Sequence, residues 1–269
     1  MLINVKICLL KGVLILLELI NITKSYGDTQ VLHDINLTIE DSDIVSILGP
    51  SGCGKTTLLN LILGLIPASS GQILYQGKDI TDTPMEKRGF NIVFQDYALF
   101  PNLNVYDNIT YGLKNNPEIS SQAEVQDLIQ LLNLEKHLEK SIRQLSGGQK
   151  QRVALARTLV MKPKILLLDE PLSALDGVIK EQIKERIHTI AKKYQLTTIM
   201  VTHDPEEALT LSDKVIILNQ GHVEQYSASQ KIVSQPATDF VDQFILNQLR
   251  IKRDNIVGLF QEEPVKERV

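Results

Sequence analysis

The fold is decided by residues 44–57, whose sequence is IVSILGPSGCGKTT. The first five residues form a mostly apolar run, which is typical of a strand buried on both faces of a parallel sheet. A glycine-rich loop and the helical pattern of residues 58–65 follow this run. Glycines let backbone N–H groups converge on phosphate oxygens, and the start of a helix adds a partial positive charge. This order of elements predicts a phosphate-binding loop.

We expect Lys55 to reach the β- and γ-phosphates of a nucleotide, and the Thr56 hydroxyl to bind Mg²⁺. Cys53 fills an unspecified position of the pattern, so we expect no chemical role for its thiol. The alternative is a glycine-rich turn that binds nothing, and the flanking strand and helix argue against it. The residues predicted to contact the nucleotide here are Gly49, Pro50, Ser51, Gly52, Cys53, Gly54, Lys55, Thr56 and Thr57.

A second part of the site is predicted where the apolar run 165–168 ends in Asp169 and Glu170. Ligands of open α/β sheets bind at the carboxyl ends of strands, which is where these acids emerge. We expect Asp169 to hold Mg²⁺ and Glu170 to polarise the attacking water. Two exposed acids at the start of a loop are the alternative, which the nearby phosphate loop disfavours.

Buried strands and helices alternate along much of the chain, with further apolar runs at 198–201 and 215–218. The predicted fold class is α/β, with a P-loop NTPase core, a mixed and mainly parallel sheet, an antiparallel β region near the N-terminus and an inserted helical subdomain. The predicted divisions are an extension at 1–15, the α/β core at 16–95 and 160–227, the helical subdomain at 96–159, and a short C-terminal helical tail at 228–269. Residues after Arg250 are charged, and we expect them to be loosely ordered.

The composition excludes several classes of protein. The net charge of −4 gives no general attraction to nucleic acid, so no nucleic-acid partner is expected. The two cysteines, Cys8 and Cys53, form no CxxC pair and no cluster with metal-ligand spacing. The longest uncharged stretch near the N-terminus, 12–17, is too short for a membrane-spanning helix.

Residues 145–149 read LSGGQ and lie between the phosphate loop and the acids Asp169 and Glu170. The three motifs, in this order, resemble the ATP-binding cassette ATPases, the motor subunits of membrane transporters. The resemblance implies ATP and Mg²⁺ as cofactors and a head-to-tail dimer in which the LSGGQ segment of one copy meets the γ-phosphate bound to the other. The loop 173–176 resembles the one that crosses the dimer axis. The residues assigned to the LSGGQ contact are Ser146, Gly147, Gly148 and Gln149, with a helix expected from Gln149 onward.

Three further roles come from the resemblance alone. Gln95 corresponds to the family residue that contacts Mg²⁺ or the water, and the loop after it touches the membrane partner. His203 corresponds to the histidine at the γ-phosphate, and Tyr26 to the aromatic residue that stacks on adenine. A surface glutamine, a structural histidine and a half-exposed tyrosine near a turn are the respective alternatives.

The segment 94–101, FQDYALFP, looks like that of the ATPases of iron(III), spermidine/putrescine, thiamine and phosphonate importers. The resemblance implies permease subunits as partners, indirectly an extracytoplasmic solute-binding protein, and a location at the cytoplasmic face of the cell membrane. Phe100 and Pro101 are candidates for docking the permease. An exporter ATPase is the alternative. An ATPase acting on nucleic acid is disfavoured, because only about fifty residues separate Gln95 from Ser146, too few for a long coiled coil.

Overall fold

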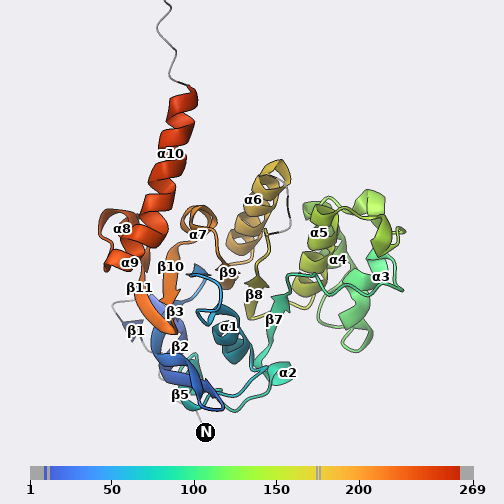
Figure 1. The fold of residues 1–269 in the computed structure, drawn as a ribbon. Coiled ribbons are helices and arrows are strands. Elements are labelled where there is room, and N and C mark those ends of the chain that lie inside the picture. The colour runs from blue at the N-terminus through green and yellow to red at the C-terminus, as the bar shows by residue number, and fades with distance from the viewer. Residues whose placement is uncertain (1–8, 11–12, 174, 176, 261–269) are drawn as a thin grey trace, which may run out of the picture.

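A central sheet of six strands organises the protein (Figure 1), and the computed structural model describes residues 9–10, 13–173, 175 and 177–260. Its strand order is β11-β10-β4-β9-β8-β7. All neighbours pair in parallel except β10 and β11. The predicted mixed, mainly parallel sheet is therefore confirmed. The strands are β4 (Ile44–Leu48), β7 (Phe90–Val93), β8 (Ile165–Asp169), β9 (Thr198–Thr202), β10 (Lys214–Asn219) and β11 (His222–Ala228).

A second, antiparallel sheet is built mainly from the N-terminal part of the chain, in the order β1-β2-β5-β6 with β3 also on β2. Its strands are β1 (Leu9–Leu10), β2 (Val13–Tyr26), β3 (Thr29–Glu40), β5 (Ser70–Tyr75) and β6 (Lys78–Asp79). Regular structure thus begins before residue 16, because β1 and the start of β2 pair with each other. Residues 1–8 and 11–12 of the predicted extension lie outside the described residues.

Alternate residues of the central strands pack into different cores, since successive side chains of a strand point to opposite faces. In β8, Ile165 and Leu167 belong to one cluster together with α1 (Lys55–Leu63) and the antiparallel sheet. Leu166 and Leu168 belong to a second cluster, with α5 (Gly147–Leu159) and α6 (Gly177–Lys193). A third cluster joins β10 to α7 (Pro205–Leu211), α8 (Ser229–Ser234) and the segments that follow. Burial on both faces explains the continuous apolar runs of the sequence.

Helices fill the chain between β7 and β8 and lie to one side of the sheet (Figure 1). They are α3 (Val105–Thr110), η1 (Tyr111–Lys114), α4 (Gln122–Leu131), η2 (Glu135–His137), η3 (Ile142–Gln144) and α5. Another short helix, α2 (Met85–Arg88), precedes β7. In α4, Val125, Leu128 and Ile129 are buried, as their helical spacing predicts.

The C-terminal part is helical as far as it is described. It contains α9 (Asp239–Val241), the π-helix η4 (Asp242–Leu246) and α10 (Asn247–Leu259), which projects from the body in Figure 1. The expected loose order after Arg250 is wrong for residues 251–259. Charged residues in α10 anchor it by ion pairs, Arg250 to Asp242 and Lys252 to Glu206. Within the described ranges, no helix combines the length and the apolar character needed to cross a bilayer.

Candidate functional site

The phosphate loop joins β4 to α1 through a turn that only glycine adopts without strain. Gly52 has φ +79°, and Gly54, the N-cap of α1, has φ +105°. Residues other than glycine rarely adopt such left-handed backbone conformations. Ser51, Gly52 and Thr56 are exposed, and Thr57 is half-buried. The loop therefore presents backbone and hydroxyl groups to solvent at the start of a helix.

Gly49 is required by a close approach to another strand. A Cβ atom at this position would lie 2.1 Å from the carbonyl oxygen of Leu218 and 2.7 Å from Cys53 Sγ. The Gly221 N–H also donates to the Cys53 carbonyl oxygen at 3.1 Å. The loop is thus fixed against the turn between β10 and β11. Burial raises the pKa of the Cys53 thiol, although the charge of Lys55 opposes the shift.

The side chain of Lys55 folds back over this loop. Its Nζ donates hydrogen bonds of 2.8 Å to the carbonyl oxygens of both Gly49 and Pro50. The residue is buried, with 7% of its surface exposed. The ammonium group is therefore held at the centre of the loop by acceptors that a ligand phosphate could replace.

The two acids lie at the carboxyl end of β8. Asp169 is the last residue of the strand, and Glu170 has φ +46°, an uncommon value for a residue with a side chain. The Glu170 N–H donates to the Val201 carbonyl oxygen at 3.0 Å, which holds this conformation. Burial and then the charge of Glu170 raise the pKa of Asp169, and Lys55 opposes them. The charges of Glu170 and Lys55 therefore both act on the Asp169 carboxyl group.

Gln95 and His203 both converge on Glu170. Gln95 Nε2 lies 3.4 Å from Glu170 Oε2 and 3.5 Å from Ser173 Oγ. His203 Nδ1 lies 3.5 Å from Glu170 Oε1. These three residues follow β7, β8 and β9, which are neighbours in the sheet. The carboxyl ends of parallel strands meet at one edge, and this brings together residues far apart in sequence.

Tyr26 ends β2 and is 50% exposed. Lys24 Nζ lies 4.9 Å from the centroid of its ring, a distance typical of a cation–π contact. No hydrogen bond joins Tyr26 to residues 49–57 in the described part of the chain.

The LSGGQ segment caps α5. Ser146 is the N-cap, its backbone N–H donates to Gln149 Oε1 at 3.0 Å, and its Oγ accepts from the Gln149 N–H at 3.4 Å. The helix thus begins at Gly147 rather than at the expected Gln149. Gly148 is buried, and a Cβ there would lie 2.6 Å from Ile179 Cγ2. Across the described ranges, residues 146–149 form no hydrogen bond with the phosphate loop or with Glu170.

The loop expected to cross a dimer axis is described only in part, because Ala174 and Asp176 lie outside the described residues. Ser173 is exposed, and its Oγ donates to the Glu170 carbonyl oxygen at 3.0 Å. The loop therefore begins next to Asp169 and Glu170, at the edge of the sheet that we call the acid edge.

Arg157 is a residue of this region that the sequence did not reveal. From α5 it donates hydrogen bonds to the carbonyl oxygens of Ala98 (2.6 Å) and Tyr97 (2.9 Å) in the loop after Gln95. Both acceptor residues have positive φ. The guanidinium carbon also lies 5.3 Å from the centroid of the Phe100 ring. A single arginine on a helix carries no motif that could have identified this contact.

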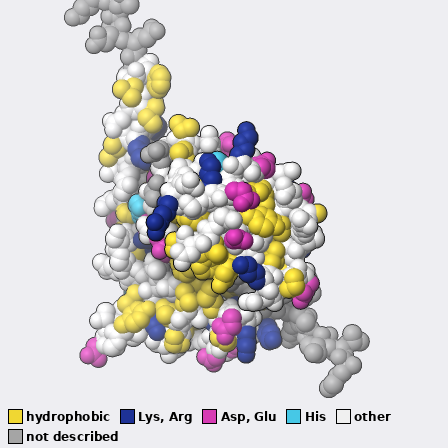
Figure 2. All heavy atoms as spheres, turned by 90° about the vertical axis from the view of Figure 1, so that its right-hand side faces the viewer, with side chains coloured by type: hydrophobic (Ala, Val, Ile, Leu, Met, Phe, Trp, Pro, Cys, Tyr) yellow, Lys and Arg dark blue, Asp and Glu magenta, His cyan; other side chains and the backbone are white. Residues whose placement is uncertain are grey.

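Figure 2 faces the helical subdomain and shows hydrophobic side chains gathered in the middle of this face. Exposed aromatic residues of this part of the chain are Phe94, Phe100, Tyr106 and Tyr111. The Phe100 and Tyr111 ring centroids lie 4.3 Å apart. The two rings thus form an exposed aromatic pair.

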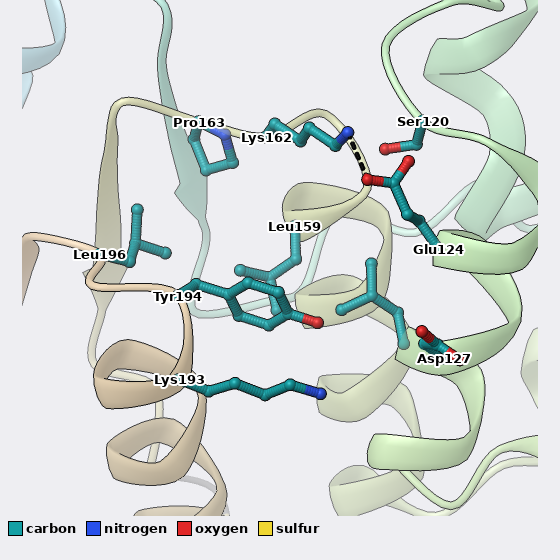
Figure 3. Close-up of a pocket in the computed structure, with 10 residues that line it drawn as sticks. Ser120, Glu124, Asp127, Leu159, Lys162, Pro163, Lys193, Tyr194 and Leu196 are labelled. Carbon is teal, nitrogen blue, oxygen red and sulfur yellow. Dashed lines mark hydrogen bonds and ion pairs between the residues drawn. The ribbon is translucent and has the colours of Figure 1, made fainter.

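A cavity of 360 Å³ lies between α4 and the end of α6 (Figure 3). Leu159, Leu196 and the Tyr194 ring line it, and the 2.6 Å ion pair of Lys162 with Glu124 lies at its edge. None of the predicted site residues lines this cavity. It is therefore separate from the strand-end site.

Comparisons with known proteins agree with the motifs. The family described as ABC transporter matches residues 32–173. The spermidine/putrescine import ATP-binding protein PotA of Mesoplasma florum is 46% identical over 250 residues, covering 92% of this chain and 70% of the relative. That of Spiroplasma citri is 48% identical over 252 residues, covering 91% and 72%. The structure of cbiO1 from Clostridium perfringens, part of the ABC transporter complex cbiONQ, has a TM-score of 0.77 at 28% identity, covering 92% of this chain and 99% of that one.

Proposed function

Because the chain belongs to the ABC transporter family, we propose that it is the ATP-hydrolysing subunit of a solute importer whose permease consists of separate membrane subunits. The observation that carries the proposal is the convergence of Gln95 and His203 on Glu170, each within 3.5 Å, at the sheet edge where the phosphate loop also lies. The two relatives are named for the import of spermidine and putrescine, so polyamines are the first solutes to test.

ATP is the substrate of this site. The phosphate loop supplies converging N–H groups, and the helix start behind it favours the negative charge of phosphates. Lys55 exchanges the carbonyl oxygens of Gly49 and Pro50 for the β- and γ-phosphates. Tyr26 stacks on the adenine ring, which its half-exposed position allows.

Thr56, Asp169 and Gln95 would hold Mg²⁺. The donor set is a hydroxyl, a carboxylate and an amide oxygen, the hard oxygen ligands that this ion prefers. The raised pKa of Asp169, caused by burial and by the charge of Glu170, also fits, because a cation would relieve the repulsion between the two carboxylates. When bound, the ion would supply positive charge to the phosphate oxygens.

Glu170 orients and polarises the attacking water and receives its proton. One of its oxygens, Oε1, faces His203 Nδ1, which fixes the carboxylate, while Oε2 faces the Gln95 amide. His203 is 57% exposed at its side chain and contacts the γ-phosphate from that position. Asp169 ends β8, whereas Glu170 follows it with φ +46° and faces Gln95 and His203, so the two acids take different roles.

The site needs a second copy of the chain. The LSGGQ segment offers a second helix start that can bind an anion, and it makes no hydrogen bond to the phosphate loop of its own chain in the described ranges. In a head-to-tail dimer, Ser146, Gly147, Gly148 and Gln149 contact the γ-phosphate held by the other copy. ATP then bridges both copies only in the closed dimer, so its binding favours closure and its hydrolysis allows opening.

The permease binds the exposed aromatic residues after Gln95, with Phe100 and Pro101 in the contact. This places the protein at the cytoplasmic face of the membrane, with an extracytoplasmic solute-binding protein acting on the other side. Opening and closing of the dimer is transmitted through this contact and drives alternating access.

The test uses the Glu170→Gln variant, because the amide keeps the shape of the side chain but cannot accept the proton of water. With ATP and Mg²⁺, we expect this variant to accumulate as a dimer in size-exclusion chromatography, with turnover at least about a hundredfold below the parent. His188→Ala, an exposed histidine of α6 without a predicted role, is the control and should match the parent. Full turnover by Glu170→Gln, or a monomer under all conditions, would contradict the proposal.

A further inference from the structure

The C-terminal end of α4 is held by arginines from two other helices. A helix leaves its last carbonyl oxygens without partners in the helix, and basic side chains near them are favourable. The last turn of α4 contains no basic residue. The carbonyl oxygens of Leu131, Leu132 and Asn133 accept instead from Arg152 of α5 and Arg186 of α6.

Arg186 holds the α4 end from the side of the core. Its Nη1 donates to the Leu131 carbonyl oxygen. Its Nη2 lies 2.6 Å from the side-chain oxygen of Asn133, when that amide is oriented with its oxygen toward the guanidinium. Asn133 has φ +52° and follows Leu132, the C-cap residue of α4. Two nitrogens of one planar guanidinium thus donate to two different acceptors in a fixed fork geometry, which the single nitrogen of a lysine does not provide.

Arg152 continues the connection to the LSGGQ segment. Its Nη1 donates to the carbonyl oxygens of Leu132 (3.1 Å) and Asn133 (3.4 Å), and its Nε donates to that of Gly148 (3.3 Å). Burial, and then the charge of Arg186, lower the pKa of the Arg152 guanidinium. Two like charges therefore lie close together, and the carbonyl oxygens that each guanidinium binds stabilise them.

We infer that Arg186 is a positioning residue, which sets where the LSGGQ segment stands relative to the acid edge of the same chain. Arg186 belongs to α6, the helix that follows the acid edge, whereas α4 and α5 belong to the helical subdomain. A groove of 550 Å³ between α5 and α6 is lined by Ser146, Gly148, Arg152 and Arg186, among others. Beside the close approach of Gly148 to Ile179 of α6, the guanidiniums connect the two helices through the end of α4.

The inference rests on the proposed function, because the position of Ser146 matters only if a second copy must be reached. Without the Arg186 contacts, the helical subdomain samples more orientations on the core. Fewer molecules then present Ser146 in the orientation that closes the dimer, while the phosphate loop is unaffected. The expected effect is on dimer formation and not on the affinity of the monomer for nucleotide.

The experiment compares Arg186→Gln, Arg186→Lys and Lys193→Gln in the Glu170→Gln background. Lys193 lies on the same helix, is exposed and forms no ion pair within the described residues, so it controls for the loss of one charge. We expect Arg186→Gln to need about tenfold more protein for ATP-dependent dimer formation, since one charged hydrogen-bonding group is lost. Arg186→Lys should recover part of this loss, and Lys193→Gln should match the parent. Monomer affinity for ATP should stay within about twofold in all of them.

A second measurement does not depend on nucleotide. Spin labels at Glu139 and His188, both exposed, report the distance between the helical subdomain and α6 in a Cys8→Ser background. Arg186→Gln should shift and broaden this distance distribution, with Arg186→Lys between it and the parent.

An unchanged distribution, or dimer formation at the parent's concentration, overturns the inference. A Glu170→Gln parent that does not dimerise instead contradicts the proposed function, and the spin labels still test the role of Arg186. If Arg186→Gln does not fold, Arg186→Lys carries both comparisons.

Discussion

Arg157 Nη2 donates a 2.9 Å hydrogen bond to the carbonyl oxygen of Tyr97, which ties the helix of the LSGGQ segment to the loop after Gln95. The same guanidinium contacts the Ala98 carbonyl oxygen and the Phe100 ring. The loop proposed to bind the permease and the helix proposed to reach the second copy are therefore connected through one side chain. We expect a movement of either to be transmitted to the other.

Arg157→Gln tests this connection. We expect the variant to keep its affinity for ATP, because the contacts of Arg157 described above do not involve the phosphate loop. The stimulation of its ATPase activity by permease subunits should be about tenfold weaker than that of the parent. The measurement is ATP turnover with and without reconstituted membrane subunits. Arg143→Gln, an exposed arginine of η3, is the control and should behave as the parent. Normal stimulation of Arg157→Gln would show that the loop needs no support from α5.

His203→Ala should lower maximal turnover by about a hundredfold, at the lower end of what a positioned acid–base group contributes. The physical reason is that Glu170 Oε1 loses the group 3.5 Å away that orients the carboxylate. Steady-state kinetics should show the change in kcat and leave the affinity for ATP within a few-fold. A variant that loses affinity but keeps kcat would assign His203 to nucleotide binding alone.

Gly49→Ala should destabilise the protein by about 1–3 kcal/mol, because the new Cβ would overlap the Leu218 carbonyl oxygen and the backbone must move. The shift displaces the phosphate loop, so affinity for ATP should fall as well. Chemical denaturation and nucleotide titration measure the two effects. Gly177→Ala is the matched control, since a Cβ there meets no atom within 4 Å and the residue does not need a positive φ. Equal stability of both variants would contradict the close approach.

Ser146→Arg should abolish ATPase activity and leave the binding of nucleotide by the monomer nearly intact. Ser146 is exposed, and its hydrogen bonds in the described chain are only with Gln149 of its own helix start, so a bulky side chain disturbs a partner more than the fold. Turnover and equilibrium nucleotide binding are measured on the same sample. Equal loss of both activities would argue that the LSGGQ segment serves its own phosphate loop.

The contribution of Glu124 to the stability of the protein should be lost at acidic pH. The hydrogen bond from Lys162, and those from the backbone and side chain of Ser121, lower the pKa of Glu124 from 4.5 to about 2. A folded-state pKa below the unfolded one means that the contribution is present above about pH 4.5 and is lost as the pH falls toward 2. The Tm difference between the parent and Glu124→Gln should therefore narrow as the pH falls through this range. Glu118→Gln, exposed and on the preceding loop, should show no such narrowing.

The local patterns of the sequence predicted the elements that carry the site. The runs 44–48, 165–168 and 198–201 became β4, β8 and β9, since strands buried on both faces need continuous apolar residues. The sequence analysis was wrong about where two helices, α5 and α10, begin or end. The helix α5 starts two residues earlier than expected because Ser146 and Gln149 cap each other, and α10 continues where charged residues suggested loose order. The roles assigned to individual site residues remain predictions.

The sequence by itself predicted the fold class, the phosphate loop, the two acids at the end of β8 and the family, because each of the patterns behind them consists of residues close together in the chain. Only the tertiary structure decided that Gln95 and His203 meet at Glu170, and that Arg157 and Arg186 hold the helical subdomain. Those contacts depend on which strands become neighbours and how the helices pack. Moreover, both arginines bind backbone carbonyl oxygens, which every residue has, so no partner for them can be recognised in the sequence.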